Sequence, residues 1–315
     1  MIDSNPTRGP LISLSRRDFL KNTAALGVCS LAPNAFAATE VLKRRIAKTA
    51  YSIPAIGMGT WLTFDVGDSA HARGKRVEIL QQFFAMGGQM IDSSPMYGTS
   101  QVVLGHCLST FKKETPTLFS ATKVWTPGRV FGIRQMKNSA DLWGVPRFDL
   151  MQVHNLLDWE THLTTLKQWR EEGRVKYIGV TTSHGRRHEK LVSIMENEPI
   201  DFVQFTYNIL DREAEQQLLP LALERGVSVI VNRPFQGSRL FDKIRDKPVP
   251  PWAAEFNCEN WAQFFLKFIL SHRAVTCAIP ATSRLDHMTE NMGALRGPLP
   301  NPKQRREMVR YYVNL

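Results

Sequence analysis

Several features that would define other classes of protein are missing from this 315-residue sequence. No G-x-G-x-x-G follows an apolar run and opens a helix, which removes the main signature of a doubly wound dinucleotide-binding sheet. No segment rich in Pro, Gly and Ser divides the chain, so we expect one domain. The 40 Lys and Arg residues are scattered rather than grouped with aromatics. In spite of a net charge of +11, this distribution argues against a nucleic-acid partner and leaves anionic small molecules open.

Long apolar runs are also absent, and the run near the N-terminus is too short to span a bilayer. It follows SRRDFLK (15–21) and ends at Ala35-Phe36-Ala37, which fits a cleavage site. These elements in this order predict a twin-arginine signal peptide over 1–37 and export to a bacterial periplasm by the twin-arginine machinery. The alternative is a chance arginine pair before a short helix. We expect residues 38–315 to form the mature protein, without a membrane anchor.

Cysteine is scarce, with four residues in the whole chain. Cys29 would leave with the signal peptide, so that Cys107, Cys258 and Cys277 remain. An odd number of cysteines in an oxidising compartment argues against a framework of disulfides. We expect the three thiols to be buried as small apolar side chains.

The sequence does contain a regular alternation of short β-branched runs with segments of helical period. The eight short runs are AIGMGTW, MIDSS, TLFSATKVW, FDLMQVHN, KYIGVTT, DFVQFTYN, VSVIVNRPF and TCAIPATS. Two helical segments end at Gly173 and Gly226, directly before the next run, as helix C-caps do. Eight such units in 38–315 predict a single (β/α)8 TIM barrel. A doubly wound open sheet is the alternative.

Polar residues stand where the second, third and fourth short runs end. Asp92 closes the second run and Tyr97 lies in the loop after it. Lys123 ends the third run and His154 the fourth. In a barrel these positions meet at one mouth, where chemistry is found. Taken singly, Asp92 could be a capping carboxylate, Tyr97 a loop aromatic and His154 a satisfied core imidazole.

No metal site is predicted. His184 and His188 are four residues apart and could form a pair of ligands, but no third ligand follows and the stretch crosses a loop.

The ordered motifs resemble those of the aldo/keto reductase family. They run from IPAIGMGTW (53–61) through IDSSPMYG (91–98) and ATKVW (121–125) to IPATSRLDHMTEN (279–291), and cover essentially all of 38–315. The resemblance implies a (β/α)8 barrel and an NADP(H)-dependent oxidoreductase that interconverts an alcohol and an aldehyde or ketone. It also implies a catalytic tetrad, which consists of Asp92, Tyr97, Lys123 and His154.

The chemistry explains these four residue types. Reduction of a carbonyl by hydride leaves an alkoxide-like oxygen that needs a proton. A phenol with an unperturbed pKa of about 10 is a slow donor near neutral pH. We therefore expect the Lys123 ammonium to lower the pKa of Tyr97, and Asp92 to hold Lys123 charged and in place. His154 would bind and orient the substrate oxygen.

The resemblance further implies cofactor-binding residues, for NADP(H) in preference to NAD(H). They are Thr181, Thr182, Gln204, Arg233, Gly237, Ser238, Thr282, Arg284 and Asn291. Two positions depart from the family, since Asn232 replaces an aromatic and Ala281 a lysine. Arg284, at a helix start, would then bind the 2'-phosphate, unless it is simply solvated. Trp61 and Trp125 match positions of the substrate pocket, with packing as the alternative.

Two functions fit this pattern. One is a periplasmic carbonyl reductase or alcohol dehydrogenase that acts on a small-molecule carbonyl substrate. The other is a redox-sensing or regulatory barrel that binds the nucleotide and turns over little. The complete tetrad favours the enzyme.

Overall fold

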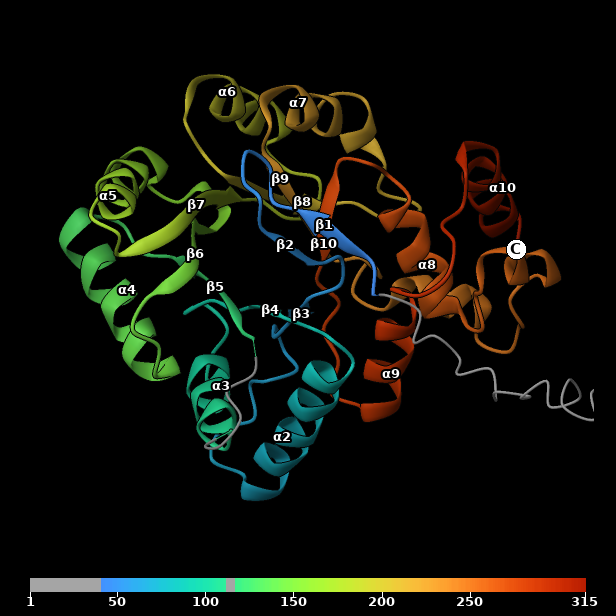
Figure 1. Cartoon of the computed structure of the whole chain (residues 1–315), viewed down its shortest axis with the longest axis horizontal. Coiled ribbons are helices and arrows are strands. Elements are labelled where there is room, and N and C mark those ends of the chain that lie inside the picture. Colours follow the sequence, from blue (N-terminus) through green and yellow to red (C-terminus); the bar gives the residue numbers. More distant parts are fainter. Residues whose placement is uncertain (1–40, 112–116) are drawn as a thin grey trace, which may run out of the picture. The chain divides into compact units, whose positions relative to one another are not determined.

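A computed structural model of the chain describes residues 41–111 and 117–315 (Figure 1). The predicted signal peptide over 1–37 lies outside the described residues. Eight parallel strands follow one another in chain order around one sheet. They are β3 (Met58–Gly59), β4 (Met90–Asp92), β5 (Phe119–Val124), β6 (Phe148–Val153), β7 (Val175–Thr181), β8 (Phe202–Thr206), β9 (Ser228–Asn232) and β10 (Val275–Ala278). The (β/α)8 barrel predicted from the sequence is confirmed.

The sheet closes where β3 meets β10. Parallel bridges join Ile56 to Ala278 and Gly59 to Ala281. At this seam the backbones come so close that a Cβ on Gly59 would lie 2.9 Å from the carbonyl oxygen of Ile279. Glycine is therefore required at position 59 for the barrel to close.

Helices surround the strands (Figure 1). The α-helices are α2 (Ala70–Ala85), α3 (Ser100–Ser109), α4 (Arg129–Trp143), α5 (Trp159–Glu171), α6 (His188–Asn197), α7 (Leu218–Arg225), α8 (Trp261–Leu270), α9 (Leu285–Gly293) and α10 (Pro302–Val313). The short 3-10 helices are η1 (His154–Leu156), η2 (Glu213–Glu215), η3 (Arg239–Ile244) and η4 (Pro251–Phe256). Gly226 ends α7 in the left-handed conformation, as predicted. Within the described ranges, no helix is long and apolar enough to cross a membrane.

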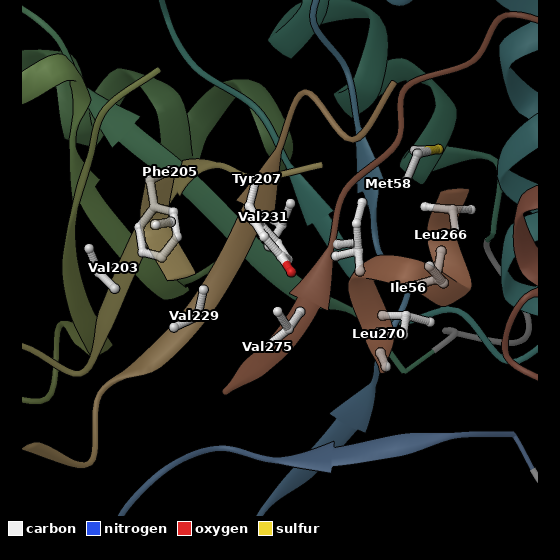
Figure 2. Packing of buried hydrophobic residues seen from close by; sticks show 14 of the residues in the cluster. Ile56, Met58, Val203, Phe205, Tyr207, Val229, Val231, Leu266, Leu270 and Val275 are labelled. Carbon is white, nitrogen blue, oxygen red and sulfur yellow. The ribbon is translucent and has the colours of Figure 1, made fainter. Parts of the chain in front are cut away.

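Apolar side chains fill the space on both sides of the sheet. The outer cluster lies between the strands and the helices, and Figure 2 shows Leu266 and Leu270 of α8 with Ile56 and Val275 in it. The inner cluster fills the barrel interior with side chains that include Met90, Phe119, Leu150, Phe202 and Ile230. Because neighbouring strand residues point to opposite sides, every strand except the two-residue β3 contributes to both clusters.

A hairpin precedes the barrel, and the sequence did not predict it. It pairs β1 (Lys43–Arg45) with β2 (Ser52–Pro54) in antiparallel register. Ile46 and Ile53 join the inner cluster, and the Ala47 N–H donates to Ser228 Oγ at the start of β9. The hairpin therefore covers the amino end of the barrel. Strands of three residues are too short to show the alternation from which strands are predicted.

The three described cysteines are free and buried. Burial raises the pKa of Cys107 to about 11 and that of Cys258 to about 12. Thiols with such pKa values carry little thiolate, so they act here as apolar packing groups.

Candidate active site

A cavity of about 350 Å³ opens among the loops at the carboxyl end of the barrel. Asp92, Tyr97 and His154 line it, and Lys123 is fully buried against Asp92. The structure therefore brings together the four residues that the sequence placed at one barrel mouth. They meet because each follows or ends a neighbouring parallel strand, so that the chain delivers them to the same end of the barrel.

The base of the site is an ion pair between Lys123 and Asp92. Their side chains are 0% and 2% exposed, and Lys123 Nζ also donates to the carbonyl oxygen of Ser93 at 2.8 Å. Burial is the largest single influence and lowers the pKa of Lys123, but the charge and hydrogen bond of Asp92 together with Tyr97 outweigh it, and the net direction is upward. Lys123 is thus an ammonium at neutral pH.

Two amides support Asp92 from the barrel interior. Gln152 Nε2 donates to Asp92 Oδ1 at 3.0 Å and Gln204 Nε2 donates to the same oxygen at 3.2 Å. Together with Lys123, which pairs with Oδ2, these two amides give both oxygens of the buried Asp92 carboxylate a hydrogen-bond donor. Sequence reasoning missed Gln152. Its position two residues before His154 lets the two side chains point to the same side of the chain, but it does not identify Asp92 as the partner of Gln152.

Tyr97 lies beside the ammonium. Lys123 Nζ is 5.0 Å from the centroid of the Tyr97 ring. Burial raises the pKa of Tyr97 by more than the charge of Lys123 lowers it, so the net direction is upward. Lys123 does lower the pKa of Tyr97, as expected, but the loss of solvent around the phenol in the cavity wall raises that pKa by more, so the expected net decrease is wrong. Tyr97 is protonated at neutral pH.

His154 completes the cluster as the first residue of η1. Its ring stands edge-on to Tyr97, with 5.6 Å between the centroids. Burial and then the nearby Lys123 charge lower the pKa of His154 to about 2, which makes the imidazole neutral at ordinary pH. Its Nδ1 atom lies 2.7 Å from Ser94 Oγ, a contact that the sequence did not predict.

Six of the predicted cofactor-binding residues line the cavity, namely Thr181, Thr182, Gln204, Arg233, Gly237 and Ser238. Asn232, which departs from the family pattern, lies among them. Its Nδ2 donates to the carbonyl oxygen of Thr182 at 2.8 Å, and its Oδ1 accepts from Thr206 Oγ1 at 2.8 Å. Asn232 therefore ties the carboxyl ends of β7, β8 and β9 together.

The loop after β9 has an unusual backbone. Arg233, Gln236, Gly237 and Ser238 have φ angles of 50°, 52°, 65° and 73°. Within this loop the Gln236 N–H donates to the carbonyl oxygen of Arg233 at 2.9 Å, and Gly237 and Ser238 line the cavity beside Arg233. The Arg233 guanidinium therefore adds positive charge to the part of the cavity wall that also carries the amides of Gln204 and Asn232.

The other three predicted cofactor residues lie outside the cavity lining. Arg284 precedes α9, and its Nε donates to Asp286 Oδ1 at 3.0 Å in an ion pair whose side chains are 62% and 57% exposed. Thr282 Oγ1 accepts from the Arg284 N–H at 3.1 Å, and Asn291 is buried in α9. The pairing of Arg284 with Asp286 was not predicted, because two adjacent exposed charges give no sign of whether they pair.

The two predicted pocket tryptophans lie in different places. Trp61 lines the cavity, and the Arg233 guanidinium stands 5.9 Å from its ring. Trp125 does not line it, and its backbone N–H donates to Gln135 Oε1 at 2.6 Å. Both side chains are 40% exposed. Leu62 and Met96 add exposed apolar surface on the lining beside Trp61.

Across residues 41–111 and 117–315, no group of three or more His, Cys, Asp or Glu side chains is arranged to hold a metal ion. His184 lines the cavity, and burial followed by nearby arginines lowers its pKa.

The barrel and its mouth define the class of protein. A neutral phenol beside a buried ammonium, with a neutral imidazole in the same cavity wall, is equipped to give a proton to a developing oxyanion. The model of the aldo/keto reductase family matches residues 55–306. The chain belongs to this family.

Individual relatives agree with this assignment. The chain is 24% identical over 201 residues to the aldo-keto reductase YhdN of Bacillus subtilis, a match that spans 59% of this chain and 60% of that relative. A structure of the thermostable aldo-keto reductase Tm1743 with the inhibitor epalrestat has a TM-score of 0.68 at 25% identity, over 86% of this chain and 99% of that one. An aldo-keto reductase from Klebsiella pneumoniae in complex with NADPH has a TM-score of 0.70 at 22% identity, over 87% and 96% of the two chains.

Proposed function

We propose that this protein is an NADP(H)-dependent oxidoreductase that reduces an aldehyde or ketone to an alcohol, or catalyses the reverse reaction. The observation that carries the proposal is the Tyr97 phenol, held in the cavity wall with Lys123 Nζ 5.0 Å from its ring centroid. A site of this kind serves a reaction in which negative charge develops on an oxygen atom.

The cavity fits the cofactor. Gln204, Asn232 and the loop that contains Arg233, Gly237 and Ser238 would hold the nicotinamide and diphosphate groups. The similar Klebsiella pneumoniae structure contains NADPH. When bound, the reduced nicotinamide supplies the hydride that the carbonyl carbon accepts. Arg284 would bind the 2'-phosphate, which would compete with Asp286 for the same guanidinium.

The chain's own residues move the proton. Tyr97 acts as general acid and gives its phenolic proton to the carbonyl oxygen. The Lys123 ammonium stabilises the tyrosinate that this step leaves, and Asp92 keeps Lys123 charged. His154, neutral at ordinary pH, binds the same oxygen and orients it. In the alcohol-oxidising direction, Tyr97 acts as the base.

The substrate is a small molecule bound against the apolar lining that Trp61, Leu62 and Met96 provide. NADPH oxidation by the mature protein, followed with a panel of aldehydes and ketones, tests the proposal. Saturable turnover supports a reductase. Tight nucleotide binding without turnover of any member of the panel would contradict it and support a regulatory barrel.

We also propose that residues 1–37 are a twin-arginine signal peptide and that residues 38–315 act in the periplasm. The support is the sequence order of Arg16-Arg17, a short apolar run and Ala35-Phe36-Ala37. Because this route moves folded proteins, the enzyme would leave the cytoplasm with NADP(H) bound. Cell fractionation tests the signal, since Arg16→Lys with Arg17→Lys should retain the protein in the cytoplasm. The nucleotide content of periplasmic protein tests export of the loaded enzyme, and empty protein would contradict it.

A further inference from the structure

Ser94 contacts the ring of His154 but takes no part in the proton transfer proposed above. It lies two residues after Asp92, in the segment that leaves β4, and its side chain is fully buried. Its Oγ atom is 2.7 Å from His154 Nδ1 and accepts a hydrogen bond from the Met96 N–H at 3.2 Å. Within residues 41–111 and 117–315, the Ser94 hydroxyl has no other partner.

The partners determine the direction of this hydrogen bond. A serine hydroxyl has one proton to donate, and the Met96 N–H occupies one lone pair of Ser94 Oγ. The hydroxyl proton then either goes to His154 Nδ1 or stays buried without an acceptor, which costs free energy. Ser94 is therefore the donor and Nδ1 the acceptor. A neutral imidazole whose Nδ1 accepts carries its own proton on Nε2.

We propose that Ser94 is a positioning residue that fixes His154 in the Nε2–H tautomer, so that Nε2 presents a hydrogen-bond donor to the cavity. This inference rests on the proposed reductase function for its catalytic consequence. A donor at Nε2 binds a carbonyl oxygen and strengthens its hold as negative charge develops there. It cannot accept a proton, so proton transfer falls to Tyr97 alone.

The tautomer is measurable without substrate or nucleotide. The full-length chain, labelled with nitrogen-15 in histidine, is recorded in long-range proton–nitrogen spectra, and His154→Gln identifies the His154 signals. We expect a protonated Nε2 and an unprotonated Nδ1 in the wild type. His162 provides an internal reference, because its Nε2 lies 2.6 Å from the carbonyl oxygen of Thr126 and must donate to it.

Substitutions of Ser94 test whether its hydroxyl, and not the fold in general, determines the tautomer of His154. In Ser94→Ala we expect the His154 signals to move toward a mixture of tautomers while those of His162 stay in place. Ser94→Thr keeps the hydroxyl and should retain the wild-type pattern, and Ser94→Cys, a weaker donor, should fall between. A protonated Nδ1 in the wild type, or an unchanged tautomer in a folded Ser94→Ala protein, would overturn the proposal.

Kinetics provide the second readout. We expect Ser94→Ala to lower kcat for carbonyl reduction by about 10- to 100-fold, the range known for partners that orient a metal-bound imidazole, while NADPH affinity stays the same. Ser139→Ala is the matched control, since Ser139 is a buried serine of α4 that accepts one hydrogen bond, from Gln101. It should change neither kcat nor the tautomer. A loss of kcat without a tautomer shift overturns the role of Ser94, whereas a wild type that reduces no carbonyl overturns the proposed function and leaves the tautomer result standing.

Discussion

Lys123 Nζ contacts both the Asp92 carboxylate, with which it forms an ion pair, and the Tyr97 ring, whose centroid is 5.0 Å away. The carboxylate keeps the ammonium charged in a fully buried place. The ammonium in turn favours the tyrosinate, although burial makes the protonated phenol the stable form before reaction. The arrangement thus holds a proton on Tyr97 at rest and stabilises the anion once the proton has left.

Removal of the carboxylate should strongly destabilise the fold. Asp92→Asn leaves Lys123 buried without its counter-charge, and breaking a buried pair in this way costs about 3 to 5 kcal/mol. Urea unfolding measures the change. Glu198→Gln is the control, because the Lys167–Glu198 pair, at 2.9 Å, is partly exposed and should contribute less than about 1 kcal/mol. Equal effects of the two substitutions would show that the Asp92 pair is not the buried anchor described here.

The pKa of Tyr97 predicts different pH dependence in the two directions of the reaction. Its net shift is upward, caused mainly by burial. Carbonyl reduction needs the phenol, so kcat/KM for reduction should show no loss from Tyr97 ionisation below about pH 10, its ordinary pKa. Alcohol oxidation needs the tyrosinate and should rise with pH over the same range. A reduction rate that falls with an apparent pKa near 7 would contradict this assignment.

His154 should make the fold less stable as the pH falls. Its pKa is about 2 in the folded state and about 6.5 in an unfolded chain. Between these values the unfolded state binds one more proton, so stability decreases with falling pH by about 1.4 kcal/mol per pH unit.

We therefore expect the pH dependence of unfolding free energy between pH 6 and 4 to be shallower in His154→Gln by about that slope. The other histidines with lowered pKa, such as His184 and His188, are present in both proteins and cancel in the comparison. Parallel curves for the two proteins would mean that His154 titrates normally.

Arg284 and Asp286 should set the preference between nucleotides. Because Ala281 offers no cation, Arg284→Ala should weaken NADPH by roughly tenfold, the loss of one charge-assisted contact, and leave NADH nearly unchanged. Asp286→Asn releases the guanidinium that Asp286 now binds and should tighten NADPH. Fluorescence titration of both nucleotides measures these changes. Equal changes for NADPH and NADH would show that this loop does not read the 2'-phosphate.

The sequence predicts what depends on periodicity and position along the chain. Eight alternating runs were enough for the barrel, and the position of Asp92, Lys123 and His154 at strand ends was enough to bring them to one mouth. Contacts between side chains from different strands are set by packing in three dimensions. For that reason the amide of Gln152 on Asp92 and the hydroxyl of Ser94 on His154 emerge only from the structure.

The direction of the Tyr97 pKa was missed for a related reason. The sequence motif predicts that the charged Lys123 lies near Tyr97, because Lys123 stands at a recognisable strand end. Burial depends on how closely the loops cover the phenol, which no local pattern encodes. The hairpin of β1 and β2 was missed because its strands are shorter than one full alternation.

The central claim is that Tyr97 gives the proton in carbonyl reduction. The most direct measurement is the single-turnover rate of NADPH oxidation by an aldehyde, compared between wild type and Tyr97→Phe with both proteins saturated with nucleotide. Tyr177→Phe is the control, since Tyr177 belongs to the inner barrel cluster and does not line the cavity. We predict a decrease of about 10²-fold or more in Tyr97→Phe, the scale of a lost general acid, with unchanged NADPH affinity and no decrease in Tyr177→Phe. A Tyr97→Phe protein that reduces the aldehyde at the wild-type rate would contradict the claim.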